Sequence, residues 1–171
     1  MEISMPSDKE DIKEENQSQV AASKAITILI DENNTLYYFK GKPDGGTDIP
    51  DEGKLFATTY GKNGLRKVLL ESNPQAVKAV QALKDKYARM ATSNVQQEQK
   101  QKAQYKEELN KIKNAEYTPS VIIKASDKAT YDNLIQVLDE MQICSIGRYV
   151  IDKFADGDRL KIEALKNGTA Q

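Results

Sequence analysis

The side chains that most often carry covalent catalysis are nearly missing from this sequence. It contains no histidine and a single cysteine, Cys144. Without an imidazole, Ser-His-Asp and Cys-His catalysis and histidine-based zinc sites are excluded. A lone cysteine forms no intrachain disulfide or thiolate metal cluster, and it more often packs as a small apolar group than acts as a nucleophile.

Patterns that bind phosphate or calcium are also incomplete. Gly53-Lys54 resembles the end of a phosphate-binding loop, but Leu55 replaces the serine or threonine that such a loop needs. Asp152 and Asp156-Gly157 have the outer spacing of a calcium loop, yet Phe154 stands where an oxygen ligand is required. We therefore expect no enzyme activity, no metal site and no cofactor.

Asp127 is the best placed of the many carboxylates. It lies in a predicted turn just before a predicted helix. An acid at a helix N-terminus typically contributes ~0.3–1 kcal/mol through capping and the helix dipole. We expect this structural role for Asp127 rather than a catalytic one.

The composition fits one modest core. The chain has 171 residues, of which 39% are hydrophobic and 30% charged, and its net charge is −1. Residues 84–113 are basic but carry only two tyrosines, so nucleic-acid binding is not expected. The longest apolar run, residues 25–30, is far shorter than the ~20 residues of a membrane-spanning helix.

The N-terminal half predicts a tail, a hairpin and a long helical stretch. Residues 1–24 hold six acids and three bases with little to bury, which is typical of a flexible segment. Residues 25–30 are rich in β-branched residues and residues 35–39 resume a strand pattern after an Asp-Glu-Asn-Asn turn, which predicts a hairpin. After a loop over residues 41–53, helical periodicity starts near Leu65, and Pro74 is expected to open a further helix. The basic stretch to about residue 115 is either one solvated extension or two helices folded back on each other.

The C-terminal third predicts a strand–helix–strand unit. Residues 120–124 are strand-like, 131–143 form an amphipathic helix, and 146–151 are strand-like again. Such a unit places its strands in parallel. Residues 156–158 are expected to form a turn, and residues 159–165 fit either an edge strand or a short helix.

These elements predict an α+β fold. We expect a small mixed sheet in the order β-β-α-β-α-β, with the helices packed on one face and a long helical insertion over about residues 75–115. The opposite face, or an edge strand, is then left for a partner.

Two segments resemble the periplasmic part of the ExbD/TolR family. The opening Glu2-Ile3-Ser4-Met5-Pro6 is similar to the extended stretch that follows the family's transmembrane helix. The strand from Val121, followed by a turn and a helix from Tyr131 through Leu134, is similar to the family's strand–Ala-Asp–Tyr–helix signature. This sequence departs from the pattern in three ways: Ser126 stands in the aspartate's place, Ser145 in a glycine's place, and residues 77–115 exceed the usual length.

The resemblance implies a single-pass protein of the Gram-negative inner membrane, with this chain in the periplasm. Its transmembrane helix, which carries the proton-relay aspartate, would precede residue 1. Residues 1–24 would then be a tether, residues 25–165 the folded domain and residues 166–171 a polar tail. A homodimer would thread an ExbB-type pentamer and use proton flow to drive a TonB-type protein in outer-membrane transport.

The same resemblance supplies the expected binding residues. Ile3, Met5 and Pro6 would lie at the channel mouth. Asp127, Tyr131 and Leu134 would lie near a strand edge that captures an extended peptide. One alternative is a TolR-like subunit that binds peptidoglycan. Another is a helical adaptor in which residues 74–115 are the binding part.

Overall fold

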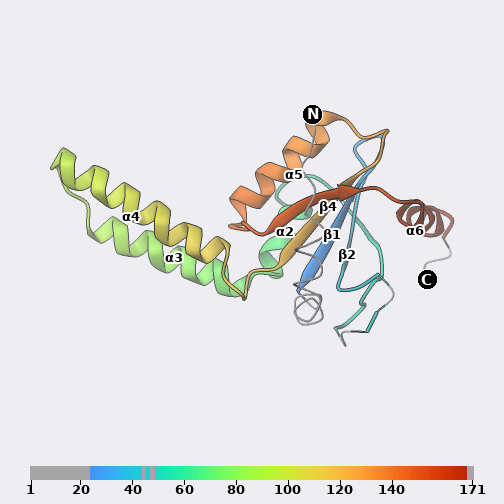
Figure 1. Cartoon of the computed structure of the whole chain (residues 1–171), viewed down its shortest axis with the longest axis horizontal. Helices are drawn as coiled ribbons and strands as arrows, with labels where there is room; N and C mark the ends of the chain where they lie inside the picture. The colour runs from blue at the N-terminus through green and yellow to red at the C-terminus, as the bar shows by residue number, and fades with distance from the viewer. Residues whose placement is uncertain (1–23, 44, 47–48, 169–171) are drawn as a thin grey trace, which may run out of the picture.

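The computed structural model describes residues 24–43, 45–46 and 49–168. Its strands form one mixed sheet in the order β3-β2-β1-β4-β5, and the predicted α+β class is confirmed (Figure 1). The strands are β1 (Ala25–Ile30), β2 (Leu36–Lys40), β3 (Phe56–Thr58), β4 (Ser120–Ala125) and β5 (Tyr149–Lys153). The helices are α2 (Leu65–Glu71), α3 (Pro74–Arg89), α4 (Val95–Lys113), α5 (Tyr131–Ile143) and α6 (Asp156–Lys166). Within the described residues, no helix combines the length and apolarity needed to cross a bilayer.

The predicted hairpin is confirmed. β1 and β2 pair antiparallel, with Ile30 opposite Leu36. Asn33 and Asn34 take positive φ values of 59° and 60°, which asparagine tolerates better than most residues. The short strand β3, which the sequence pattern missed, extends this hairpin by pairing with β2.

The parallel arrangement of the C-terminal unit is also confirmed. β4 pairs in parallel with β1 on one side and with β5 on the other. β5 begins at Tyr149, three residues later than expected. The reason is that Ile146 stays with the end of α5, where its N–H donates to the carbonyl of Met141 at 2.8 Å.

Helices cover both faces of the sheet, so the expectation of one helical face is wrong. Residues Ile26, Ile28 and Ile30 of β1 face the core under α2 and α5, whereas Leu29 faces a second cluster that contains Ile162 of α6. In Figure 1, α2 and α5 lie to the left of the strands and α6 lies to the right. The face opposite α2 and α5 is therefore partly occupied by the chain's own last helix.

α6 replaces both the turn expected at residues 156–158 and the strand considered for 159–165. Asp158 ends up inside the first turn, where its carboxylate accepts the N–H of Ala155 at 2.8 Å. The same carboxylate pairs with Lys124 of β4 at 3.2 Å. An acid that satisfies an N-terminal N–H favours helix at this point.

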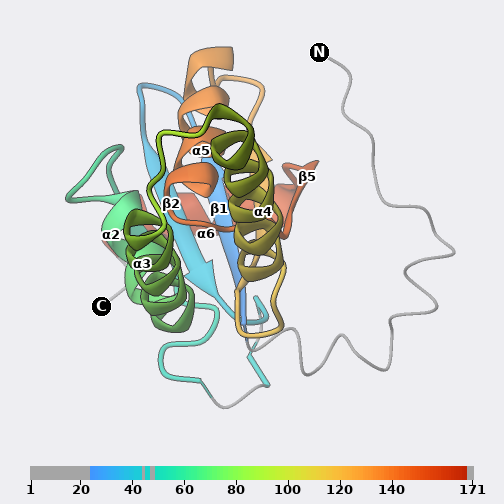
Figure 2. The same ribbon diagram turned by 90° about the vertical axis from the view of Figure 1, so that its left-hand side faces the viewer.

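α3 and α4 form a helical arm that projects from the sheet (Figures 1 and 2). Pro74 is the first residue of α3, as expected, and the two helices fold back on each other. Their contact includes an edge-on pair of Tyr87 and Tyr105, with ring centroids 5.4 Å apart, and a hydrogen bond from the Tyr87 hydroxyl to Glu108. No residue of α4 is buried, so the arm contributes little to the core.

Ser145 is held in the left-handed region, at φ 60°, directly after α5. A residue with a Cβ is strained there, whereas glycine is not. We expect Ser145→Gly to raise the free energy of unfolding by about 1 kcal/mol, measured by urea denaturation. Ser145→Ala keeps the Cβ and should give no gain, so equal effects of the two variants would contradict the explanation.

Candidate functional site

β5 forms an open edge of the sheet. It pairs with β4, and within the described residues no strand pairs with its other side. The carbonyl of Arg148 accepts the N–H of Val121 at 2.9 Å, which fixes the alternation along the strand. Because successive residues of a strand point their main-chain groups to opposite sides, the N–H and C=O groups of Tyr149, Ile151 and Lys153 face away from β4. Such an edge can add a further strand.

A hollow of about 560 Å³ lies beside this edge. The strands β1, β4 and β5 are parallel, so their carboxyl ends meet at one end of the sheet. We call this space the C-terminal hollow; residues from β4, β5, α5, α6 and the loops between them line it. Its lining includes Asp127, Leu134, Ile151, Asp152, Lys153, Phe154, Asp156 and Arg159.

The structure thus brings together two of the predicted binding residues and separates a third. Asp127 and Leu134 both line the C-terminal hollow. Tyr131 opens α5 with 59% of its surface exposed and is not part of the lining. Ile3, Met5 and Pro6 lie outside the described residues.

Asp127 does not cap α5, so that expectation is wrong. The cap is Thr130, whose hydroxyl accepts the N–H of Asn133 at 3.1 Å while the Asn133 side chain accepts the N–H of Thr130 at the same distance. This reciprocal capping box satisfies the helix start without Asp127. The Asp127 carboxylate is exposed in the turn and contributes its charge to the hollow.

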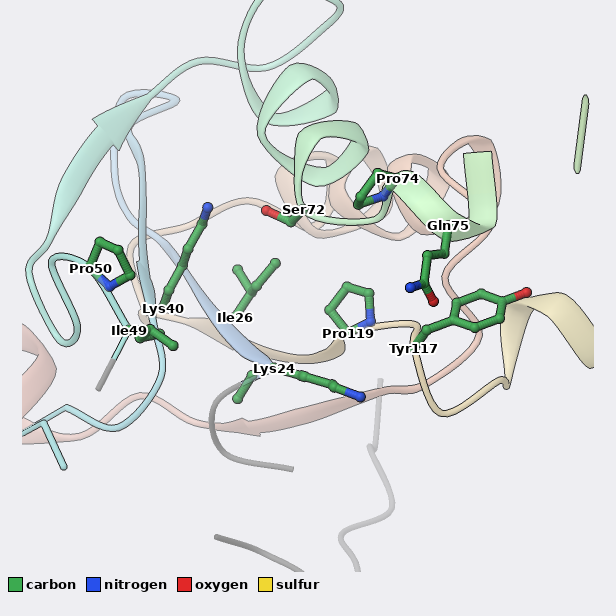
Figure 3. A pocket seen from close by; sticks show the side chains of 11 residues that line it. Lys24, Ile26, Lys40, Ile49, Pro50, Ser72, Pro74, Gln75, Tyr117 and Pro119 are labelled. Atoms are coloured by element: carbon green, nitrogen blue, oxygen red, sulfur yellow. The ribbon is translucent and has the colours of Figure 1, made fainter. Parts of the chain in front are cut away.

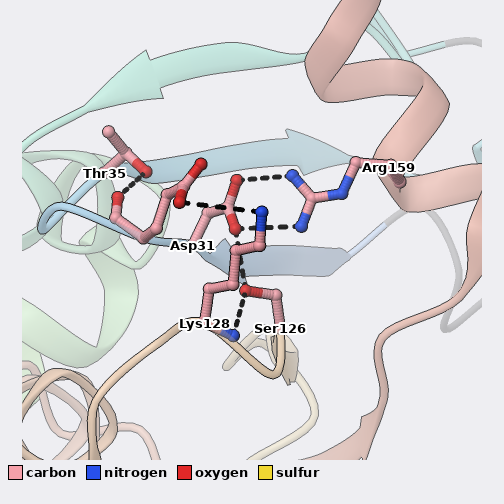
Figure 4. Close-up of polar contacts among 6 residues, drawn as sticks. Asp31, Thr35, Ser126, Lys128 and Arg159 are labelled. Carbon is pink, nitrogen blue, oxygen red and sulfur yellow. Dashed lines mark hydrogen bonds and ion pairs between the residues drawn. The ribbon is translucent and has the colours of Figure 1, made fainter.

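A buried polar cluster adjoins the hollow through Arg159 (Figure 4). Asp31, which has no exposed side-chain surface, accepts two hydrogen bonds from Arg159 of α6 at 2.7 and 3.0 Å. The Ser126 hydroxyl donates to the same carboxylate at 2.7 Å. The hydrogen bonds from Arg159, more than those from Ser126, lower the pKa of Asp31 to about 2 despite its burial. Asp31 in turn raises the pKa of Arg159.

The charged side chains that line the hollow are mainly negative. Asp127, Asp152 and Asp156 all line it, against Lys153 and Arg159. The Arg159 guanidinium is already paired with Asp31 and also lies 5.0 Å from the Phe154 ring centroid. The hollow therefore suits a cationic side chain that arrives along the β5 edge.

The burial of the thiol and the grouping of the acidic residues decide whether the described chain holds a reactive or metal-binding arrangement. Burial raises the pKa of the Cys144 thiol to about 12, so the thiol stays protonated at neutral pH and serves packing. Within the described part of the chain, no group of three or more Cys, Asp or Glu side chains is arranged to hold a metal ion.

Most of the chain matches a known protein family. A family model described as "Biopolymer transport protein ExbD/TolR" matches residues 1–154. The chain belongs to the ExbD/TolR family. Neither the curated proteins nor the solved structures contain a match to it. ExbD/TolR proteins are non-enzymatic, are anchored in the inner membrane with a periplasmic domain, and work with partners of the ExbB/TolQ and TonB/TolA kinds.

This ExbD/TolR chain extends beyond the matched range. The match ends at Phe154, immediately before α6. The hydrogen bonds between Asp31 and Arg159 therefore join the part of the chain that the family model matches to α6, which follows that part. The Ser126 hydroxyl donates to Asp31; a carboxylate at position 126 would instead repel Asp31 at hydrogen-bonding distance.

Proposed function

We propose that this chain is the periplasmic part of an ExbD-like subunit that passes the energy of proton flow to a TonB-type protein for outer-membrane transport. The family membership supports the general role of an energising subunit in biopolymer transport. The observation that supports peptide capture is the open β5 edge, which ends in an acidic hollow. Residues 1–24 act as the tether to the membrane anchor, with Ile3, Met5 and Pro6 at the mouth of an ExbB-type channel. The working unit is a homodimer.

The partner segment binds as an added strand. Its main chain pairs with the outward groups of Tyr149 and Ile151 and with the carbonyl of Lys153, whose N–H already donates to Asp152 at 2.7 Å. Because side chains alternate along a strand, every second residue of the segment reaches the sheet face near the hollow. The aspartates there favour a segment with lysine or arginine at that position.

Reversing the charge at Asp127 tests whether the hollow favours a cationic side chain of the partner segment. Asp127→Lys should weaken the binding of the cognate TonB-type periplasmic segment by about 1 kcal/mol, or roughly fivefold, because it reverses a charge at the hollow. The affinity is measured by isothermal titration calorimetry at two salt concentrations, and the loss should shrink at the higher one.

Asp139→Lys is the matched control. Asp139 is equally an exposed aspartate but lies on α5 outside the hollow, so its reversal gives the same net charge and should leave the affinity unchanged. Equal losses in both variants would mean that only the overall charge matters. If the wild-type chain instead pelleted with purified peptidoglycan sacculi and ignored the TonB-type segment, the TolR-like alternative would replace the ExbD-like role.

A further inference from the structure

A second cavity lies at the opposite end of the sheet. Its walls come from the start of β1, the end of β2, the start of α3 and the segment before β4, and it encloses about 480 Å³ (Figure 3). This volume falls in the range of ~300–1,000 Å³ that is common for small-ligand sites. We call it the lysine pocket, after Lys24 and Lys40, which line it with Ile26, Pro74, Tyr117 and Pro119.

Among the described residues, the lining of the lysine pocket carries positive charge alone. Both charged residues of this lining are lysines, and no aspartate or glutamate of the described ranges belongs to it. The Lys24 amine donates to the carbonyl of Glu116 at 3.0 Å, which leaves its charge in place. Lys40 is half-buried, and its amine makes no hydrogen bond or ion pair with any residue of the described ranges. Charges withdrawn from water are normally paired, so the pocket favours an anion.

The rest of the wall is apolar and rigid. Ile26 is buried and lies between the two lysines, and Pro119 and Tyr117 form the side nearer the arm (Figure 3). Prolines and a tyrosine offer flat surfaces for aliphatic groups or proline rings. The ligand should therefore carry an apolar group next to its negative charge.

Main-chain groups of the pocket argue against phosphate as the preferred anion. Sites for phosphate usually present several N–H groups at a helix start. Here α3 starts with Pro74, which has no N–H to donate. Single ammonium groups and apolar walls match a carboxylate with an attached hydrocarbon better than they match a phosphate.

We propose that the lysine pocket binds a short acidic peptide, with a carboxylate on the Lys40 amine, a neighbouring proline or aliphatic side chain on Ile26 and Pro119, and Lys24 adding positive charge to the same lining. This site lies away from β5 and does not depend on strand capture there. It also adjoins both the arm and residue 24, where the described domain begins.

The test uses the full 171-residue chain, labelled with ¹⁵N, and follows amide shifts during titration with the dipeptide acetyl-Pro-Glu. The amide shifts should concentrate at residues 24–26, 40, 117 and 118. The neutral analogue acetyl-Pro-Gln amide should bind at least about tenfold more weakly, the scale of a lost charge-assisted hydrogen bond. The double variant Lys24→Gln/Lys40→Gln should lose binding to a similar extent.

Lys62→Gln is the matched control, because Lys62 is an exposed lysine outside the pocket and its replacement should change nothing. If the double variant fails to fold, Lys40→Gln alone keeps the part of the aliphatic stem nearest the main chain and still removes the half-buried charge. Equal binding of the neutral analogue, or full binding by the lysine variants, would overturn the proposal. Inorganic phosphate that binds as tightly as the dipeptide would overturn the assignment to a peptide.

Discussion

Asp31→Asn is expected to lower the free energy of unfolding by about 2–3 kcal/mol at neutral pH. The substitution removes the negative partner of Arg159, whose side chain is 29% exposed, and leaves an amide in a buried site that was built for a carboxylate. The loss should appear in urea denaturation followed by far-UV circular dichroism. Because Arg159 belongs to α6, this helix should be the first to lose protection in hydrogen exchange.

The same aspartate predicts a pH dependence. Its pKa falls from an ordinary 3.8 to about 2 on folding, so its contribution to stability is present above about pH 4 and is lost as the pH falls towards 2. This lowering of the Asp31 pKa corresponds to roughly 2 kcal/mol of folding stability. In the Asp31→Asn variant, this part of the acid destabilisation should be missing.

Glu32→Gln supplies the control for both measurements. Glu32 follows Asp31 in the hairpin turn and pairs with Lys128 at 3.8 Å, but the side chains of both Glu32 and Lys128 are well exposed. An exposed pair of this kind contributes about 0–1 kcal/mol. If Glu32→Gln were as destabilising as Asp31→Asn, the buried cluster would not be the reason for the loss.

Ile151→Pro is expected to reduce the affinity for the TonB-type segment by at least about tenfold. Its N–H faces the open side of β5, so proline removes a donor to the added strand while the ladder with β4 stays intact. The partner's carbonyl is then left without a donor, which costs about 1–3 kcal/mol. Calorimetry with the same segment gives the affinity.

Ile151→Ala separates this effect from packing. It removes the same side-chain contacts with the core but keeps the N–H. Alanine should therefore lower stability while leaving the affinity within about twofold of wild type. A comparable loss of affinity in both variants would show that the side chain, and not the strand edge, holds the partner.

Local patterns were enough to predict much of the fold. Residues 25–39 and 131–143 carry turn chemistry and periodicity that act within a few residues, and both elements formed where expected. The second helical face was missed although a signal was present. Residues 26–30 are buried without interruption, and a strand that is apolar on both sides needs cover on both sides.

The sequence of α6 was ambiguous because its apolar residues fit both the period of a strand and the period of a helix. Leu160 and Ile162 alternate as in a strand, yet Leu160 is 65% exposed and Ile162 is fully buried. Tertiary contacts favour the helix over the strand: Ile162 packs in one cluster with Leu29, and Arg159 pairs with Asp31. The latter pair is separated by 128 residues, so no window along the sequence reveals it.

The candidate site was predictable only in part. The resemblance to the ExbD/TolR family placed Asp127 and Leu134 near a partner, and both line the hollow. Arg159 and Phe154 gave no signal of their own, because their place depends on how α6 turns back over the sheet. The lysine pocket was missed because the predicted hairpin brings together only Lys24 and Lys40, whereas Pro74 and Tyr117 of its lining come from segments far along the chain.

The course of the parallel strands has a mechanical consequence. A pulling force that enters at Ala25 and leaves through a partner on β5 runs lengthwise through β1, β4 and β5. Lengthwise sliding breaks the hydrogen bonds of a ladder together, whereas peeling breaks them one at a time. A domain loaded in this direction is therefore expected to resist rupture better than its modest size suggests, which fits the proposed role between a membrane tether and a partner on β5.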